Sequence, residues 1–188
     1  MIRGITNKNI LDNFCEEFCK IIEKHCKYII VSGFLAISTG RVRATEDIDM
    51  IMEKLDKNKF IKLHEELIDN NFVCVQSDNF VEIYEYLISD LSVRYTFKNK
   101  PLPEMEIKFA KDELDEYQLK TRIKLEKTGL DVWFGSIEMN IAFKEEYLKS
   151  NKDLEDARHL REIFKENINE DEIIKIKGFI RRIKLGEK

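Results

Sequence analysis

Turn-forming residues are scarce in this chain, which has only 2 prolines and 7 glycines among its 188 residues. Long loops depend on such residues, so their shortage predicts a fold that is dense in helices and strands. Apolar runs are also short, and none approaches the length needed to span a membrane. The first residues lack the apolar core of a signal peptide. We therefore expect a cytoplasmic protein with no membrane partner.

Cysteine pairs with the spacing of metal ligands are missing as well. The four cysteines, Cys15, Cys19, Cys26 and Cys74, include no C-x-x-C pair. Cys15 and Cys19 stand at the i, i+4 spacing of one helix face, but a zinc site there would need ligands from elsewhere in the chain. Free, buried thiols in a reducing compartment are the favoured interpretation.

A basic excess is absent too, because the formal net charge is -4. The average charge therefore gives no sign of nucleic-acid binding. Apolar residues make up 43% of the chain, which is enough for the core of one domain. The predicted C-terminal helix, Glu170 to Lys188, is rich in Lys and Arg. Two interpretations stay open for it: a capping helix with a solvated basic face, or a surface that holds an RNA backbone.

The most informative stretch runs from Tyr28 to Met52. It contains a short apolar run, a Ser32-Gly33 turn, a helical segment, and a second apolar run that carries Asp47 and Asp49. This order predicts a strand, a tight turn, a short helix and a strand.

The spacing of the two aspartates indicates their chemistry. Side chains two residues apart on a strand share one face, so Asp47 and Asp49 project together while Ile48 and Met50 point into a core. Two adjacent carboxylates repel each other unless a cation lies between them. Oxygen ligands that leave room for substrate phosphates suit Mg²⁺. The backbone N–H groups of the Ser32-Gly33 turn could hold phosphate oxygens.

Taken together, this stretch resembles the nucleotidyltransferase superfamily, whose fold is shared by DNA polymerase beta. The segment GFLAISTGRVRATEDIDMIM is most similar to minimal nucleotidyltransferase-like proteins, including the AbiEii-type toxins. The chain departs from the family pattern at Phe34, where the family usually has Gly or Ser. Ser32 precedes the glycine instead of following it, and it would supply the turn hydroxyl from the other side.

The resemblance implies a third carboxylate on a neighbouring strand, which would bind metal and act as a base. Glu106 stands in the matching place, and Glu104 is its rival on the same strand face. The implied mechanism uses two Mg²⁺ ions and an NTP. Arg41 and Arg43 would hold triphosphate oxygens; the alternative is a salt bridge to Glu46 or to the aspartates.

A second family signature covers a helical lysine followed by K-D-x-x-D. Lys144, Lys152, Asp153 and Asp156 match it. In the family this region faces the nucleotide, so Lys144 and Lys152 become candidate nucleotide ligands. The alternative is an ordinary surface lysine, with Asp153 placed to favour a helix start.

Hydrophobic periodicity predicts the remaining elements. Four helices are expected over residues 10–27, 57–70, 78–87 and 136–148. Asp78 and Ser136 are the expected N-caps of the last two. Three strands are expected over residues 72–75, 91–97 and 105–109. The last two should form an antiparallel pair beside the aspartate strand. Residues 121–126 and 130–134 predict a hairpin around Gly129.

These observations predict an α/β (α+β) nucleotidyltransferase fold, a mixed β-sheet flanked by helices with a C-terminal helical segment. Residues 1–135 would form the catalytic core and residues 136–188 the helices packed on it. The predicted function is Mg²⁺-dependent transfer of an NMP from an NTP to a hydroxyl on tRNA or other RNA, on a protein or on a small molecule. A toxin–antitoxin role with a partner protein is compatible with it. The alternative is a catalytically inactive member that binds a nucleotide or a partner.

Overall fold

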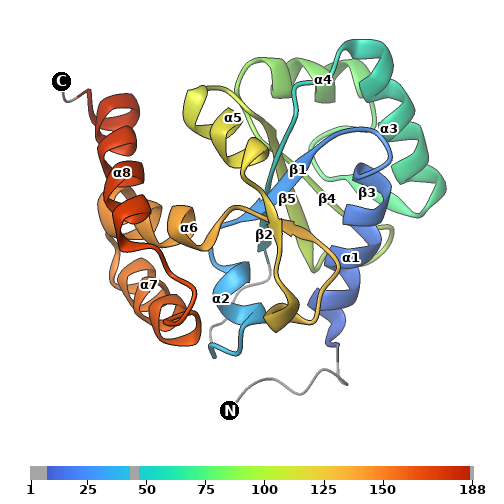
Figure 1. Ribbon diagram of the computed structural model, residues 1–188. Coiled ribbons are helices and arrows are strands. Elements are labelled where there is room, and N and C mark those ends of the chain that lie inside the picture. Colours follow the sequence, from blue (N-terminus) through green and yellow to red (C-terminus); the bar gives the residue numbers. More distant parts are fainter. Residues whose placement is uncertain (1–7, 43–46, 187–188) are drawn as a thin grey trace.

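The computed structural model describes residues 8–42 and 47–186. Figure 1 shows helices arranged around a central sheet, with the three last helices grouped at one side. The sheet has seven strands in the order β3-β4-β5-β2-β1-β7-β6. The strands are β1 Tyr28–Val31, β2 Asp47–Met52, β3 Phe72–Cys74, β4 Val93–Phe97, β5 Glu104–Phe109, β6 Ile123–Lys124 and β7 Trp133–Phe134.

The sheet is mixed, as the sequence predicts. β2 pairs parallel with β5 and β1 pairs parallel with β7, whereas the other neighbours are antiparallel. The predicted antiparallel pair beside the aspartate strand is confirmed as β4 and β5. The predicted hairpin is confirmed as β6 and β7, with Gly129 at φ +70° in the connection.

The helices expected from periodicity are present, together with α5 and α7. They are α1 Ile10–Ile22, α2 Phe34–Ser38, α3 Lys57–Asp69, α4 Phe80–Ile88, α5 Glu113–Lys120, α6 Ile137–Phe143, α7 Asn151–Ile163 and α8 Glu170–Ile180, with a 3₁₀ turn η1 Glu126–Thr128 and two π-helical ends, η2 Lys144–Leu148 and η3 Arg181–Leu185.

Of the two predicted N-caps, one is confirmed and the other is wrong. Ser136 is the N-cap of α6, accepting a hydrogen bond from the Met139 N–H. Asp78 is not the N-cap of α4, because Asn79 has the extended backbone of a cap and its side chain accepts from the Val81 N–H at 2.9 Å. The first helix ends at Ile22, earlier than predicted.

The two faces of the sheet differ in chemistry. One face carries the core: Phe14 and Phe18 of α1 pack edge-on against Phe72, with ring centroids 5.7 and 5.1 Å apart. Ile48 and Met50 of β2 point to this side and are almost fully buried, as the strand alternation predicts. The opposite face of β2 carries Asp47 and Asp49, and it is covered by α5 and a small apolar cluster instead of a thick core.

The C-terminal helices pack on one another through apolar side chains. Ile173, Ile176 and Ile180 of α8 are buried, and α8 lies against α6. Glu145 of η2 connects these helices, because it accepts a hydrogen bond from Arg161 of α7 and forms a salt bridge with Lys177 of α8. The boundary predicted between residues 135 and 136 falls just before α6 and stays a prediction. In the described part of the chain, no helix is both long enough and apolar enough to cross a membrane.

Candidate active site

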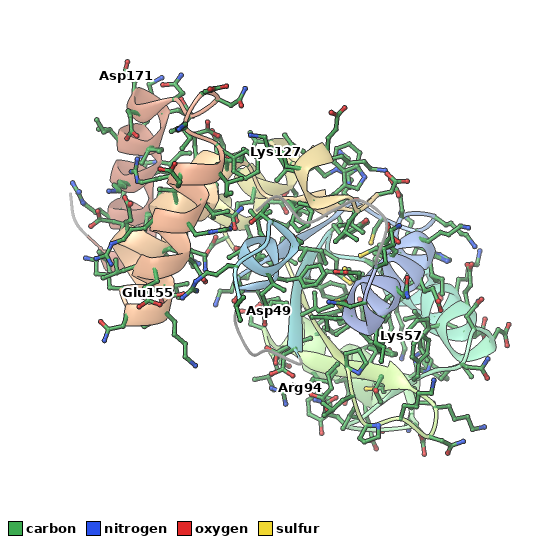
Figure 2. The ribbon with its side chains drawn as sticks, turned by 90° about the horizontal axis from the view of Figure 1, so that it is seen from below. Asp49, Lys57, Arg94, Lys127, Glu155 and Asp171 are labelled. Carbon is green, nitrogen blue, oxygen red and sulfur yellow. The ribbon has the colours of Figure 1, made fainter. Side chains whose placement is uncertain are left out.

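Strand register brings the predicted carboxylates together. In the parallel pair of β2 and β5, Asp47 lies opposite Glu104 and Asp49 opposite Glu106. Neighbouring strands lie about 4.8 Å apart, and opposed residues project from the same face of the sheet. Each opposed pair of carboxylates is therefore close enough to bind one cation. Figure 2 views this end of the sheet, with Asp49 and Arg94 labelled.

The Ser32-Gly33 turn lies directly beside this pair, because Val31 is the register partner of Asp49 in the antiparallel pair of β1 and β2. Ser32 adopts φ +68°, the left-handed region that non-glycine residues seldom occupy. Gly33 has an ordinary helical φ of -80° and is the N-cap of α2. The strained residue is therefore the serine, and its hydroxyl acts on the Asp49 carboxylate by lowering its pKa.

Asp49 is a carboxylate whose charge the protein only partly compensates. Burial raises the pKa of Asp49, the Ser32 hydrogen bond lowers it, and the nearby charges of Glu106 and Asp47 raise it again. Lys108 lowers the pKa of Asp49 through its positive charge. The net result is a raised pKa, which marks a position that would gain from a bound cation.

Glu106 is held by an arginine that the sequence interpretation missed. Arg94 of β4 is the register partner of Glu106, and its Nη2 donates to the Glu106 carboxylate at 2.7 Å. The Arg94 Nε lies 3.5 Å from Glu104, the rival third carboxylate. The alternation of β4 was the available signal, since it places residue 94 on the face that Glu106 occupies in the paired strand.

The donor set fits Mg²⁺ in kind, and the strand register puts it on one face of the sheet. Asp47, Asp49 and Glu106 offer hard carboxylate oxygens from one face of two adjacent strands. Within the described residues, however, no three His, Cys, Asp or Glu side chains converge as a ready set of ligands. Glu106 faces Arg94, so it would have to turn away from the guanidinium to join the aspartates.

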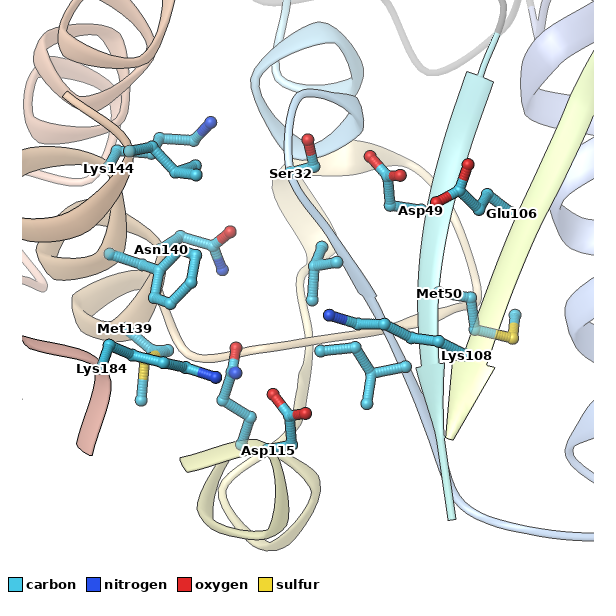
Figure 3. Close-up of a pocket in the computed structure, with 15 residues that line it drawn as sticks. Ser32, Asp49, Met50, Glu106, Lys108, Asp115, Met139, Asn140, Lys144 and Lys184 are labelled. Carbon is cyan, nitrogen blue, oxygen red and sulfur yellow. The ribbon is translucent and has the colours of Figure 1, made fainter. Parts of the chain in front are cut away.

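A cavity of about 230 Å³ opens beside these carboxylates. Of the predicted residues, Ser32, Asp49, Glu106 and Lys144 line it. Figure 3 shows the carboxylates at one end of the cavity and polar side chains of α5 and α6 farther in. Sequence interpretation missed five polar lining residues, which are Lys108, Asp115, Gln118, Asn140 and Lys184.

Phe34 does not obstruct the turn. Its side chain is almost fully buried and stacks on Phe134 with ring centroids 6.5 Å apart. Phe34 is absent from the cavity wall. The departure from the family pattern thus places an aromatic ring in the core and not in the cavity beside the turn.

Lys144 is a buried cation in an ionic network. It is 1% exposed, and its Nζ lies 2.8 Å from Asp156 and 3.5 Å from Asp153. Asp156 is fully buried and also binds Arg41, whose guanidinium reaches Glu155 at 2.5 Å. This network ties the end of α2 to α7 and to η2, so Lys144 is not a surface lysine.

The other predicted nucleotide ligands lie outside the cavity wall. Arg41 forms a salt bridge, as one alternative predicted, but among the described residues its partners are Asp156 and Glu155 and not Asp47 or Asp49. Lys152 is exposed, and its carbonyl accepts from Arg41 at 3.3 Å. Arg43 and Glu46 lie outside the described residues.

The chain matches no protein-family model, and no curated protein matches it. Among solved structures, the fold is similar to the antibiotic-resistance factor ANT(2'')-Ia, known from a solution structure said to reveal substrate-regulated conformation dynamics. The TM-score is 0.52 at 13% sequence identity, over 93% of this chain and 95% of that chain. A likeness at this identity concerns the fold, and it confirms the predicted nucleotidyltransferase-like fold with a mixed sheet flanked by helices. The AbiEii-type branch stays a prediction.

Proposed function

We propose that the protein is a nucleotidyltransferase that moves an NMP from an NTP to a hydroxyl acceptor. The observation that carries this proposal is the register of β2 and β5, which sets Asp49 opposite Glu106 at the mouth of a polar cavity. The fold supports it, because ANT(2'')-Ia, an aminoglycoside nucleotidyltransferase, has a similar one.

Asp47, Asp49 and Glu106 are the proposed Mg²⁺ ligands. When bound, Mg²⁺ would neutralise phosphate charge and lower the pKa of the acceptor hydroxyl. Ser32 orients Asp49 through its hydroxyl and keeps that carboxylate ready to bind a cation. Glu106, once released from Arg94, is placed to accept the proton of the acceptor hydroxyl.

The transfer step is an in-line substitution at the α-phosphorus. The acceptor oxygen forms a bond to phosphorus, and the bond from that phosphorus to the bridging oxygen breaks. The hydroxyl proton passes to Glu106, and pyrophosphate leaves with the bonding electron pair. Lys144 offers a positive charge at the cavity wall for the phosphates, held in place by Asp156. Gly33, Arg41, Arg43 and Lys152 remain secondary candidates for phosphate contact.

Acceptors on RNA, on a partner protein and on small molecules are all compatible with a hydroxyl nucleophile. The resemblance to AbiEii-type toxins adds tRNA and a cognate antitoxin to the acceptors and partners to be screened.

One observation favours a second candidate function. The 2.7 Å bond between Arg94 and Glu106 occupies the carboxylate that catalysis would use. A chain in which this bond persisted would bind a nucleotide or a partner without catalysing transfer.

Calorimetric titration of each NTP, with and without Mg²⁺, tests the proposal. We expect binding that requires the metal and is lost in Asp47→Asn/Asp49→Asn. Asp69→Asn is the matched control, because this aspartate is exposed at the end of α3 and its loss leaves the cavity intact. NTP binding that depends neither on the metal nor on the aspartates would contradict the proposed nucleotidyltransferase function.

A further inference from the structure

The inner part of the cavity contains a cation that the proposed mechanism does not use. Glu104, Glu106 and Lys108 alternate along β5, so Lys108 projects from the same face as the third carboxylate. Residues two apart on a strand are separated by roughly 6.5–7 Å. Figure 3 shows the Lys108 side chain reaching into the cavity, between the Asp49 end and the Asp115 end.

Lys108 is not committed to a structural ion pair. Across residues 8–42 and 47–186 its ammonium makes no hydrogen bond or salt bridge, and it acts on Asp49 through space. The other two lysines of the cavity are engaged: Lys144 by Asp156 and Lys184 by Asp112. Lys108 is therefore the lysine of this cavity wall that can take a ligand anion without losing a partner.

The surrounding groups suit hydroxyls. Gln118 and Asn140 are both 6% exposed and line the cavity. The Asn140 amide nitrogen donates to the carbonyls of Gly135 and Ser136 at 3.0 Å each, which leaves its oxygen as an acceptor. Asp115 is buried and accepts from the Lys111 N–H at 3.2 Å, so it retains lone pairs for a further hydroxyl donor.

Lys108 distinguishes an anionic acceptor from a polycationic one. Lys144 and Lys184 are paired with Asp156 and Asp112, so Lys108 is the lysine of the wall whose charge would attract an anion and repel an ammonium group. A monoanionic compound can pair with Lys108, whereas an aminoglycoside would have to pair with the carboxylates of the same wall, which are Asp49, Glu106 and Asp115.

We propose that Lys108 binds an anionic group of the acceptor, so that the acceptor is a small hydroxyl compound carrying one carboxylate or phosphate. This inference rests on the proposed function. An anion on Lys108 would hold a hydroxyl a few bonds away, next to Asp49 and Glu106, where the transfer takes place.

The test is NMR titration of the full chain, saturated with Mg²⁺ and a non-hydrolysable NTP analogue. The probes are glycerol 3-phosphate, glycerol as its uncharged match, lactate as a carboxylate, and tobramycin as a polycation, at constant ionic strength. We expect glycerol 3-phosphate or lactate to shift the backbone amides of β5 and α5 more strongly than glycerol or tobramycin does.

Lys108→Gln should weaken binding of the anionic probe about ten-fold, which corresponds to the loss of one charge-assisted contact. Lys98→Gln, an exposed lysine just beyond β4, should leave it unchanged. Amide spectra of both variants without probe establish that each is folded.

Three results would overturn the inference. They are tighter binding of tobramycin than of both anions, equal anion binding by Lys108→Gln, and anion binding that occurs without the nucleotide analogue but is lost in its presence, which would assign Lys108 to the NTP. If the analogue itself does not bind, the proposed function fails and the acceptor site fails with it. Analogue binding without Lys108-dependent anion binding removes the inference alone.

Discussion

The Arg94 guanidinium lies 2.7 Å from the Glu106 carboxylate, and the register of β4 and β5 sets the two residues directly opposite each other. The arginine thus competes with any metal ion for the third carboxylate. It also lies near the charges of Glu104 and Asp47, which together with Glu106 raise the pKa of Arg94.

Replacing Arg94 should strengthen metal binding. In Arg94→Gln the competing cation is gone, so we expect Mn²⁺ to bind roughly three- to ten-fold more tightly, as measured by electron paramagnetic resonance of free Mn²⁺. The pair is partly exposed, so the fold should tolerate the change. Lys100→Gln, exposed beyond the same strand, is the control. Unchanged or weaker Mn²⁺ binding by Arg94→Gln would show that the arginine does not compete with metal.

The ionised Asp49 carboxylate should lower the stability of the folded protein when no metal is bound. Its pKa is raised in the folded state, mainly by burial, so the fold disfavours the ionised form. The cost is therefore present above the folded pKa and disappears as the pH falls below the unfolded value of about 3.9.

Asp49→Asn should accordingly raise the melting temperature at pH 7 without divalent cations, and the gain should shrink toward pH 3. Calorimetry with and without Mg²⁺ measures both effects, since the metal should stabilise the wild type more than the variant. Asp69→Asn serves again as the exposed control. A lower melting temperature for Asp49→Asn at pH 7 would mean that the carboxylate is satisfied by the protein alone.

Phe34 should matter for stability and not for the nucleotide. Its buried ring stacks on Phe134, so Phe34→Ala should cost about 3–5 kcal/mol of unfolding free energy in urea. Phe34→Leu keeps most of the volume, should cost less, and should bind NTP with wild-type affinity. An improved NTP affinity in Phe34→Leu would indicate that the ring hinders the turn after all.

Glu145 should make the C-terminal helices sensitive to acid. Its hydrogen bond with Arg161 and its contact with Lys177 lower the pKa of Glu145. A lowered pKa adds stability above the unfolded value, near 4.3, and that stability is lost as the pH falls through the folded pKa.

Glu145→Gln should therefore cost about 1 kcal/mol at pH 7 and nothing near pH 3, as followed by urea unfolding at each pH. Glu162→Gln removes an exposed i, i+3 pair between the end of α7 and Lys165 just beyond it, and it should be neutral at both pH values. Equal losses for Glu145→Gln at pH 7 and pH 3 would rule out an electrostatic origin.

Local patterns predicted most of the fold. The alternation at Ile48 and Met50 fixed which face of β2 is buried, and it thereby placed Asp47 and Asp49 on the other one. The apolar stripe of α8 predicted its packing through Ile173 and Ile176. These features depend on residues close in the chain, so periodicity was sufficient.

The site was predicted less completely because it depends on long-range pairing. The alternation of β4 can place Arg94 on a face of the sheet, but its pairing with Glu106 follows from the register between two strands. Arg41 and Asp156 are likewise far apart in the chain, and their salt bridge follows from the packing of α2 on α7. Lys108 and Asn140 come to one cavity only after the sheet and α6 are assembled.

The most direct test of the central claim is a transfer assay. Purified protein would be incubated with Mg²⁺, each NTP labelled at the α-phosphate, and pools of RNA, protein or small hydroxyl acceptors. The account predicts labelled product and pyrophosphate from the wild type and from Asp69→Asn, and neither from Asp47→Asn/Asp49→Asn. Label transfer that survives in the double variant would contradict the assignment of these aspartates, and metal-dependent NTP binding without transfer to any pool would favour the non-catalytic module.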